Sequence, residues 1–296
     1  MDLVTVSPRF PRPGETVVGS RFLTYAGGKG ANQAVAVARM GGKSAMIGRV
    51  GGDIFGPQLL EGLNGAGVDV SGIRVNPNGS SGIAVIGVDE TAQNCITQIL
   101  GANDTCGPSE SAAVRHRLSE AAALLLQLEV SIELSLEVAR EAKAQGVMAI
   151  LDPGPVRPVP NELLTLCDVI TPNETEAQAL VGFPVNGPDS AAEAANRLLE
   201  VGVGSVVVKL GAQGAYFAAR TTRGMVQPFD VAAVDSVAAG DAFNGALAVS
   251  LVEGKGLEEA ATIASAAGAL SVTKTGAQDS MPERSLVEEL VQNQRS

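Results

Sequence analysis

The sequence contains no tryptophan, and only 3% of its 296 residues are aromatic. Its one histidine, His116, lies between Arg115 and Arg117 in a polar stretch that favours an exposed helix. Ser-His-Asp hydrolysis and histidine-based metal centres are therefore not expected. Because hydrophobic residues still make up 45% of the chain, the core must consist mainly of Ala, Val and Leu. Such a core suits a parallel sheet covered by alanine-rich helices.

Cysteine is also scarce. The three cysteines, Cys95, Cys106 and Cys167, are an odd number without a zinc-binding spacing, so neither a disulfide framework nor a zinc site is expected. We therefore expect a reducing, cytoplasmic location. The sequence has no run of about 18 apolar residues and no signal-peptide pattern at its start, which argues against a membrane partner. The net charge of −11 argues against a nucleic-acid partner.

Residues 234–247 combine small side chains with one carboxylate. Residues 238–240 (Ala-Ala-Gly) precede Asp241, and an apolar periodic segment follows, which predicts a loop that opens into a helix. The unpaired N–H groups of such a helix start can bind phosphate oxygens when no bulky side chain covers them. Asp241 could act there as a general base for a substrate hydroxyl, or it could only cap the helix.

A second glycine-rich turn covers residues 27–34 (Gly-Gly-Lys-Gly-Ala-Asn-Gln-Ala). It is not a Walker A loop, which needs Ser or Thr directly after the lysine, and it is not a dinucleotide fingerprint. The glycines could serve only a tight turn. They could also let a small polar ligand approach the backbone, where Lys29 and Asn32 would supply hydrogen bonds to hydroxyl groups.

Predicted helices and strands alternate in the second half of the chain, which is typical of βαβ units and a mostly parallel sheet. The expected strands there are residues 123–128, 147–151, 168–171 and 205–210. The residues that follow these strands should meet at one edge of the sheet, where ligands bind in such folds. They are Glu129, Asp152, Asn173 and Gly211.

The first hundred residues differ from this alternation. Four strands occur there in two pairs, with no helix between the members of either pair. These expected strands are residues 2–6, 16–25, 82–88 and 94–100. They predict a small β element beside the α/β body, while residues 45–50 are expected to form a further strand.

Two strand ends allow more than one interpretation. Asn173 at a helix start, with Glu176 three residues later, resembles a capping box, but the pair could equally hold phosphate, or metal through water. The strand that ends at Lys209 leads into residues 210–214 (Leu-Gly-Ala-Gln-Gly), which could be only a turn or could face a nucleotide.

The motifs, taken in order, resemble the signatures of the ribokinase-type sugar kinases. These motifs are residues 27–34, 171–176 (Thr-Pro-Asn-Glu-Thr-Glu) and 238–245 (Ala-Ala-Gly-Asp-Ala-Phe-Asn-Gly). Shorter matches at residues 13–16, 127–129 and 275–278 extend the resemblance over nearly the whole chain.

The resemblance implies a single α/β kinase domain over residues 1–296. Its fold would be a ribokinase-like three-layer sandwich with a mostly parallel central sheet and a small β-sheet lid. The lid strands would come from residues 2–25 and 81–101. The lid would cover the sugar and form the contact of a homodimer.

The family's roles carry over to matching positions. Asp241 would take the proton of the sugar's primary hydroxyl, and backbone N–H groups of Ala238, Ala239 and Gly240 would stabilise the transferring phosphoryl group. The residues expected to bind the sugar are Asp2, Gly27, Gly28, Lys29, Asn32, Glu129 and Asp241. The residues expected to face ATP are Asn173, Glu176, Lys209, Leu210, Gly211, Ala212, Gln213, Gly214, Gly240 and Ser265.

The resemblance also implies two cations. Glu176 would support Mg²⁺ through water. A monovalent cation, K⁺, would lie under the anion hole, held by side chains of Asp235 and Ser280 and by backbone carbonyls. Those carbonyls are expected from Val237, Ser271, Lys274 and Gly276.

The expected reaction is the ATP-dependent phosphorylation of a small sugar, foremost D-ribose to D-ribose 5-phosphate. A kinase for deoxyribose or for another small sugar or sugar acid is the enzymatic alternative, and a non-catalytic sugar-binding protein is the alternative from another class. The last alternative arises because family members usually have a strand and a sugar-binding asparagine before the position of Asp2. We expect that two strands of the main sheet then lack partners, and that the natural protein begins upstream of Met1.

Overall fold

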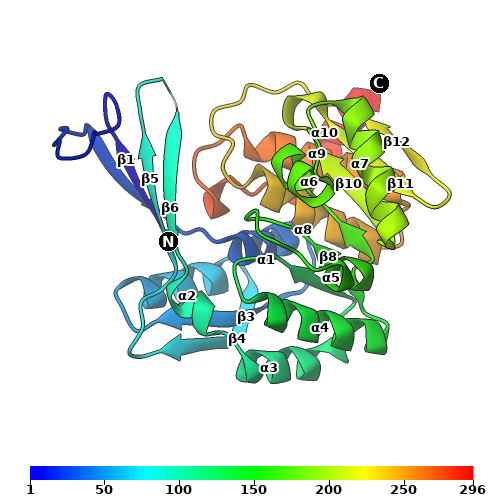
Figure 1. The fold of residues 1–296 in the computed structure, drawn as a ribbon, viewed down its shortest axis with the longest axis horizontal. Helices are drawn as coiled ribbons and strands as arrows, with labels where there is room; N and C mark the ends of the chain where they lie inside the picture. The colour runs from blue at the N-terminus through cyan, green and yellow to red at the C-terminus, as the bar shows by residue number, and fades with distance from the viewer. Residues whose placement is uncertain (92, 296) are drawn as a thin grey trace.

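The computed structural model describes residues 1–91 and 93–295 and contains three β sheets with helices around them (Figure 1). Ala92, inside the expected lid segment, lies outside the described residues. No helix in the described ranges has the length and apolar character needed to cross a membrane. The helices are α1 (Lys29–Arg39), α2 (Phe55–Gly65), α3 (Pro108–Leu118), α4 (Ile132–Gln145), α5 (Asn161–Leu166), α6 (Glu174–Val181), α7 (Pro188–Val201), α8 (Ala239–Val252), α9 (Leu257–Ser271) and α10 (Arg284–Arg295).

The largest sheet has the strand order β12-β11-β10-β9-β8-β7. Strands β7 to β10 are parallel, whereas β11 and β12 continue the sheet in antiparallel pairs. The parallel part confirms the predicted alternation. The bounds are β7 (Ala123–Leu126), β8 (Met148–Leu151), β9 (Val169–Ile170), β10 (Ser205–Lys209), β11 (Ala215–Ala219) and β12 (Arg223–Val226).

Apolar clusters cover both faces of this sheet. Val206 and Val208 of β10 pack in the cluster formed with α3 to α7, while Val207 packs in the cluster formed with α8 to α10. Successive side chains of a strand point to opposite faces, so a strand buried on both sides needs an uninterrupted apolar run. The helices supply many alanines to these clusters, for example Ala194 of α7 and Ala264 of α9.

A four-stranded sheet with the order β2-β1-β5-β6 projects from this body in Figure 1. The strands β1 (Asp2–Val6), β5 (Ile83–Val88) and β6 (Asn94–Ile99) lie where the sequence predicts them, and β5 and β6 form the expected antiparallel hairpin. The second strand was predicted too long, because β2 covers only Arg21–Tyr25. Residues 16–19 form no strand.

The third sheet contains two parallel strands, β3 (Ser44–Gly51) and β4 (Val68–Asn76). Strand β4 was not predicted, because its apolar alternation is interrupted at Ser71 and Gly72, near the point where its register with β3 shifts. Strands β11 and β12 were not predicted either.

A cavity of about 1020 Å³ separates the two-stranded and six-stranded sheets. Nearly all of β3 and all of β7 line it, including Met46 and Leu125. Within residues 1–91 and 93–295, no strand pairs with the edges of β3 and β7 that border this cavity. The structure therefore fits the expectation of two strand edges without partners.

Candidate active site

Helix α8 begins as expected at the small residues before Asp241. The residue before its first turn is Ala238, the one non-glycine residue with positive φ in the described ranges, at 59°. A positive φ is unfavourable for alanine, and such strained residues cluster at functional sites. Asp241 is the third residue of the helix, and its side chain makes no capping hydrogen bond. The interpretation of Asp241 as only a helix cap is therefore wrong.

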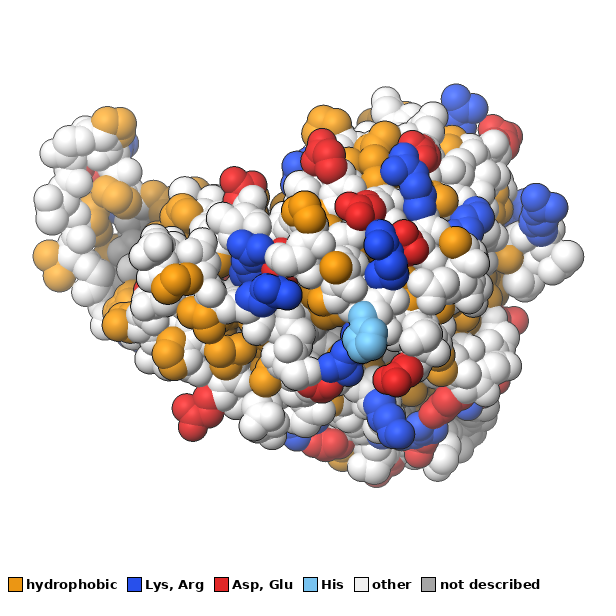
Figure 2. All heavy atoms as spheres, turned by 90° about the horizontal axis from the view of Figure 1, so that it is seen from below, with side chains coloured by type: hydrophobic (Ala, Val, Ile, Leu, Met, Phe, Trp, Pro, Cys, Tyr) orange, Lys and Arg blue, Asp and Glu red, His pale blue; other side chains and the backbone are white. Residues whose placement is uncertain are grey.

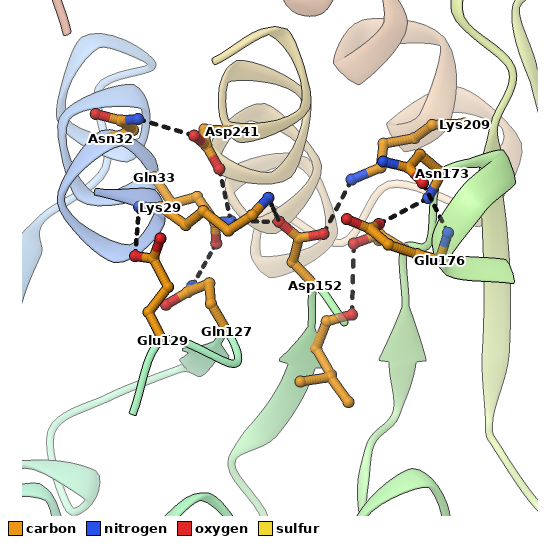
Figure 3. A network of polar contacts seen from close by, with 12 residues as sticks. Lys29, Asn32, Gln33, Gln127, Glu129, Asp152, Asn173, Glu176, Lys209 and Asp241 are labelled. Carbon is orange, nitrogen blue, oxygen red and sulfur yellow. Dashed lines mark hydrogen bonds and ion pairs between the residues drawn. The ribbon is translucent and has the colours of Figure 1, made fainter. Parts of the chain in front are cut away.

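The carboxylate of Asp241 is instead held by helix α1, as Figure 3 shows. Asn32 donates from Nδ2 to one carboxylate oxygen at 2.9 Å, and Gln33 donates from Nε2 to the other at 3.1 Å. Asp241 is 4% exposed. Burial raises its pKa to about 6, although Lys29, Asn32 and Gln33 oppose this shift. A carboxyl group with this pKa is suited to accept a proton near neutral pH.

Asp152, at the carboxyl end of β8, lies between two lysines. Lys29 Nζ is 3.2 Å from one of its oxygens and Lys209 Nζ is 3.1 Å from the other. Burial alone would raise the pKa of Asp152, but the two ammonium groups lower it. Burial would lower the pKa of Lys29, but the carboxylates of Asp152, Asp241 and Glu176 raise it. Lys29 and Asp152 are therefore charged at neutral pH.

The turn before α1 brings several predicted sugar-binding residues together. Glu129 accepts the backbone N–H of Lys29 at 2.9 Å, and its other carboxylate oxygen accepts Gln98 Nε2 of β6 at 2.9 Å. A side chain at Gly27 would collide with the carboxylate of Asp2, which explains this glycine. Gly28 has a φ of 94°, which favours glycine. Of the residues predicted to bind the sugar, Asp2, Gly27, Gly28 and Glu129 line the cavity described above.

The predicted nucleotide residues lie beyond Asp152, at the ends of β9 and β10. Asn173 and Glu176 form the predicted capping box: Asn173 accepts the Glu176 N–H and Glu176 accepts the Asn173 N–H, each at 2.8 Å. A side chain at Gly154 would strike both Glu176 and Lys29, so these two lie close together. Lys209 reaches the start of α8, since a Cβ added at Gly240 would lie 3.2 Å from its Nζ.

Residues 210–214 form the connection between β10 and β11. Gly211–Gln213 is a short 3₁₀ helix, and Gly211 and Gly214 have φ values of 53° and 89°. These residues therefore form the turn that the sequence predicts. In α9, Ser265 has a buried hydroxyl oxygen without a hydrogen-bond partner.

The structure also gathers part of the expected cation site. Asp235 accepts the backbone N–H groups of Val237 and Gly276, each at 3.0 Å. The carbonyl of Ser271 accepts the Lys274 N–H at 3.3 Å, and the hydroxyl of Ser280 donates to the Ala277 carbonyl. These bonds place the Asp235 carboxylate next to residues 237 and 276, whose carbonyls are among the expected cation ligands. Among the described residues, no group of three or more His, Cys, Asp or Glu is arranged so that it could hold a metal ion.

Four residues of this network had no predicted role. Asp152 was placed at the correct edge of the sheet, but no function was assigned to it. Gln33 directly follows Asn32, and Gln127 lies two residues before Glu129, both of which were predicted to bind the sugar. Gln127 donates from Nε2 to the side-chain oxygen of Gln33. Gln98 lies on a strand without any motif, so the sequence contains no signal for its contact with Glu129.

A family model described as "pfkB family carbohydrate kinase" matches residues 1–284. The chain belongs to this family. It is 38% identical to the ribokinase of Haemophilus influenzae, over 96% of this chain and 92% of that protein. It is 36% identical to the deoxyribokinase of Salmonella typhi, over 95% of this chain and 92% of that protein.

Solved structures support the same assignment. The structure of Arabidopsis thaliana ribokinase complexed with ribose and ATP superimposes with a TM-score of 0.90 at 36% identity, covering 98% of this chain and 95% of that one. The chain therefore has the ribokinase-like α/β fold and is a ribokinase-type carbohydrate kinase.

Proposed function

We propose that this protein transfers the γ-phosphoryl group of ATP to the primary hydroxyl of D-ribose, giving D-ribose 5-phosphate and ADP. The observation that carries the proposal is the buried Asp241 carboxylate, which is held by two α1 amides at an uncovered helix start. The relatives named above add the substrate class, since one is a ribokinase and another was solved with ribose and ATP.

In the proposed reaction, Asp241 accepts the proton of the sugar hydroxyl as the hydroxyl oxygen attacks the γ-phosphorus. The bond from the γ-phosphorus to the bridging oxygen breaks, and its electron pair leaves on ADP. Backbone N–H groups of Ala238, Ala239 and Gly240 would stabilise the charge on the transferring group, and Lys209 lies next to Gly240. These parts act by positioning and by electrostatic stabilisation, which dominate phosphoryl transfer.

The sugar would lie between α1 and the four-stranded sheet, which we propose acts as a lid in a single kinase domain over residues 1–296. Asp2 and Gln98 fall on one face of this sheet, because their strands place both opposite Ala84. Asp2, the turn at Gly27 and Gly28, Lys29, Asn32 and Glu129 would bind the sugar hydroxyls. Asn173, Glu176, Ser265 and residues 209–214 would contact ATP.

The other face of the lid supports a homodimer. Phe22, Val85 and Ile99 lie on it, and they are 64%, 41% and 42% exposed. An exposed apolar patch on a small sheet is typical of an interaction surface. We propose that two copies join through these faces. Light scattering coupled to gel filtration would show a dimer for the wild type and a shift toward monomer for Phe22→Ser.

The proposal includes two cations. Mg²⁺ is usually held by one or two carboxylates, water and substrate phosphates, and Glu176 beside the nucleotide turn fits that pattern. Mg²⁺ would neutralise phosphate charge in the reaction. K⁺ would lie at Asp235 and the carbonyls of Val237, Ser271, Lys274 and Gly276, with the Ser280 hydroxyl nearby. The three cysteines carry no disulfide, which fits the cytoplasmic location that we propose.

A coupled assay of ADP release tests this function. Purified protein would be given Mg-ATP and D-ribose, 2-deoxy-D-ribose or D-fructose, with the Asp241→Asn protein as the control. We expect the highest kcat/KM for D-ribose and a 5-phosphate product by NMR. A preference for 2-deoxy-D-ribose would favour the second candidate, which the deoxyribokinase relative supports. Sugar binding without turnover would favour a non-catalytic protein.

A further inference from the structure

Asp152 joins the two halves of the proposed site. Its carboxylate is 0% exposed and contacts three side chains from two different parts of the fold. Lys29 and Gln33 come from the turn and first residues of α1 on the sugar side, and Lys209 comes from the end of β10 on the nucleotide side. Figure 3 shows the carboxylate between these two sets.

We propose that Asp152 is a positioning residue that holds the ammonium groups of Lys29 and Lys209 in place for phosphoryl transfer. This inference rests on the proposed function. Asp152 is fully covered by its partners, so it would act through the two lysines without touching either substrate.

The geometry explains why such a residue is needed. Two lysines that converge on one small site repel each other, and their long side chains have many rotamers. One buried carboxylate with a separate oxygen for each ammonium group offsets the repulsion and fixes one rotamer of each lysine. Asp152 accepts Lys29 on Oδ2 and Lys209 on Oδ1. Each ammonium group keeps further donors, which remain available for phosphate or hydroxyl oxygens.

The positions of the two lysines fit this role. Lys209 Nζ reaches Gly240, at the helix start where the transferring phosphoryl group would lie. Lys29 begins α1, the helix that holds Asp241 through Asn32 and Gln33. Asp152 therefore sets the position of the Lys209 ammonium group beside the phosphoryl group and of the Lys29 ammonium group beside the sugar.

Asp152 should also influence the proton acceptor. The charged groups that face Asp241 are Lys29 from α1, Asp152 after β8 and Asp2 of β1, and the neutral amides are Asn32 and Gln33. Asp152 raises the pKa of Asp241. The Asp152→Asn substitution removes this negative charge and releases Lys29 from its ion pair, and both changes lower the pKa of Asp241. A role confined to packing would leave this pKa unchanged.

The experiment compares wild type with Asp152→Asn, Lys209→Met and the double variant. Binding of the non-hydrolysable analogue AMP-PNP is measured by calorimetry, and kcat and KM are measured across pH. We expect Asp152→Asn to lower kcat by about 10- to 100-fold, since small displacements of catalytic groups cost that much. AMP-PNP should bind more weakly, and the acidic limb of kcat/KM should move to lower pH.

The double variant separates positioning from structure. If Asp152 acts through Lys209, the losses from the two single changes should not add, and the double variant should bind AMP-PNP about as weakly as Lys209→Met. Additive losses in binding would overturn the proposal. The double variant also removes one negative and one positive charge together, so it remains informative if Asp152→Asn alone does not fold.

Asp168→Asn is the matched control. Asp168 accepts the Ala149 N–H at 2.8 Å in the same sheet, beside β9, and contacts none of the site residues named above. The Asp168→Asn variant should leave the pH profile of kcat/KM unchanged. An unshifted acidic limb in Asp152→Asn would count against the proposal. A wild type that binds AMP-PNP but phosphorylates no sugar would defeat the proposed function alone, because the binding comparison needs no sugar.

Discussion

Asn32 and Asp241 are 209 positions apart in the sequence, yet the amide of one donates to the carboxylate of the other at 2.9 Å. This bond joins the start of α1 to the start of α8. Because Gln33 occupies the second oxygen of the same carboxylate, two neighbouring residues of one helix fix the orientation of Asp241. The glycine-rich turn and the helix start are therefore one site.

Replacing Asp241 by Asn should abolish turnover while AMP-PNP and sugar still bind. The amide has nearly the size of the carboxylate but cannot accept the hydroxyl proton, and loss of a general base costs about 10²–10⁴-fold in rate. Steady-state kinetics and calorimetry on the same preparation would check this, with Asp168→Asn as the control. Near-normal turnover would remove Asp241 from the mechanism.

The pH dependence should show an acidic limb in kcat/KM near pH 6. Burial raises the pKa of Asp241 to about 6, and only the ionised form can accept a proton, so activity should rise as pH increases through that value. Gln33 lowers this pKa by donating to the carboxylate, so Gln33→Met should move the limb to higher pH. Gln145→Met, at the exposed end of α4, is the control. A limb that stayed in place would contradict the assignment.

Replacing Asn32 by Ala should raise the KM for the sugar and change the KM for ATP little. Asn32 lies on the sugar side of Asp152, and its side-chain oxygen is buried without a partner, so it has a free acceptor for a hydroxyl group. Loss of a neutral hydrogen bond to a ligand should raise KM by roughly 2- to 10-fold, from about 0.5–1.5 kcal/mol. If only the KM for ATP rose, the turn at residues 27–34 would be a nucleotide site.

Potassium should activate the enzyme through the loop that precedes α8. Asp235 binds the N–H groups of Val237 and Gly276, so a cation there would stiffen the segment that leads to Ala238. We expect a higher kcat in KCl than in NaCl or choline chloride at equal ionic strength. Asp235→Asn should reduce that difference, and equal rates in all three salts would exclude the cation site.

Local patterns predicted much of this fold, and the reasons for the failures are physical. The bounds of helix α4 follow from local signals, because Ser131 caps its first turn and Gly146 ends it in the left-handed conformation. Strand β4 was missed because Ser71 and Gly72 interrupt its alternation. The carboxyl ends of the strands grouped Glu129, Asp152 and Asn173 correctly, since this rule depends only on topology. The contacts of Asp152 with two lysines depend on side-chain positions that strand order does not specify.

The cavity between β3 and β7 leads to a prediction about stability. Met1 lies near the carboxyl ends of both strands: its amine donates to Gly82 at 2.8 Å, close to Ser81, which binds the last residue of β3. Glu129, which follows β7, also acts on this amine. An extended segment that ended at Met1 would therefore run parallel to β3 and β7 and could pair with both.

A six-residue apolar strand and a short turn fused in front of Met1 should raise the melting temperature. The strand would pair with two edges that have no partner there, and each buried backbone group left unpaired costs about 1–3 kcal/mol. Each kcal/mol gained is worth roughly 2–4 °C in a chain somewhat smaller than this one. Fusion also keeps the donor to Gly82, because the amine becomes an amide N–H. A Gly-Ser segment of equal length is the matched control. Equal melting temperatures for the two fusions would show that the cavity does not accept a strand.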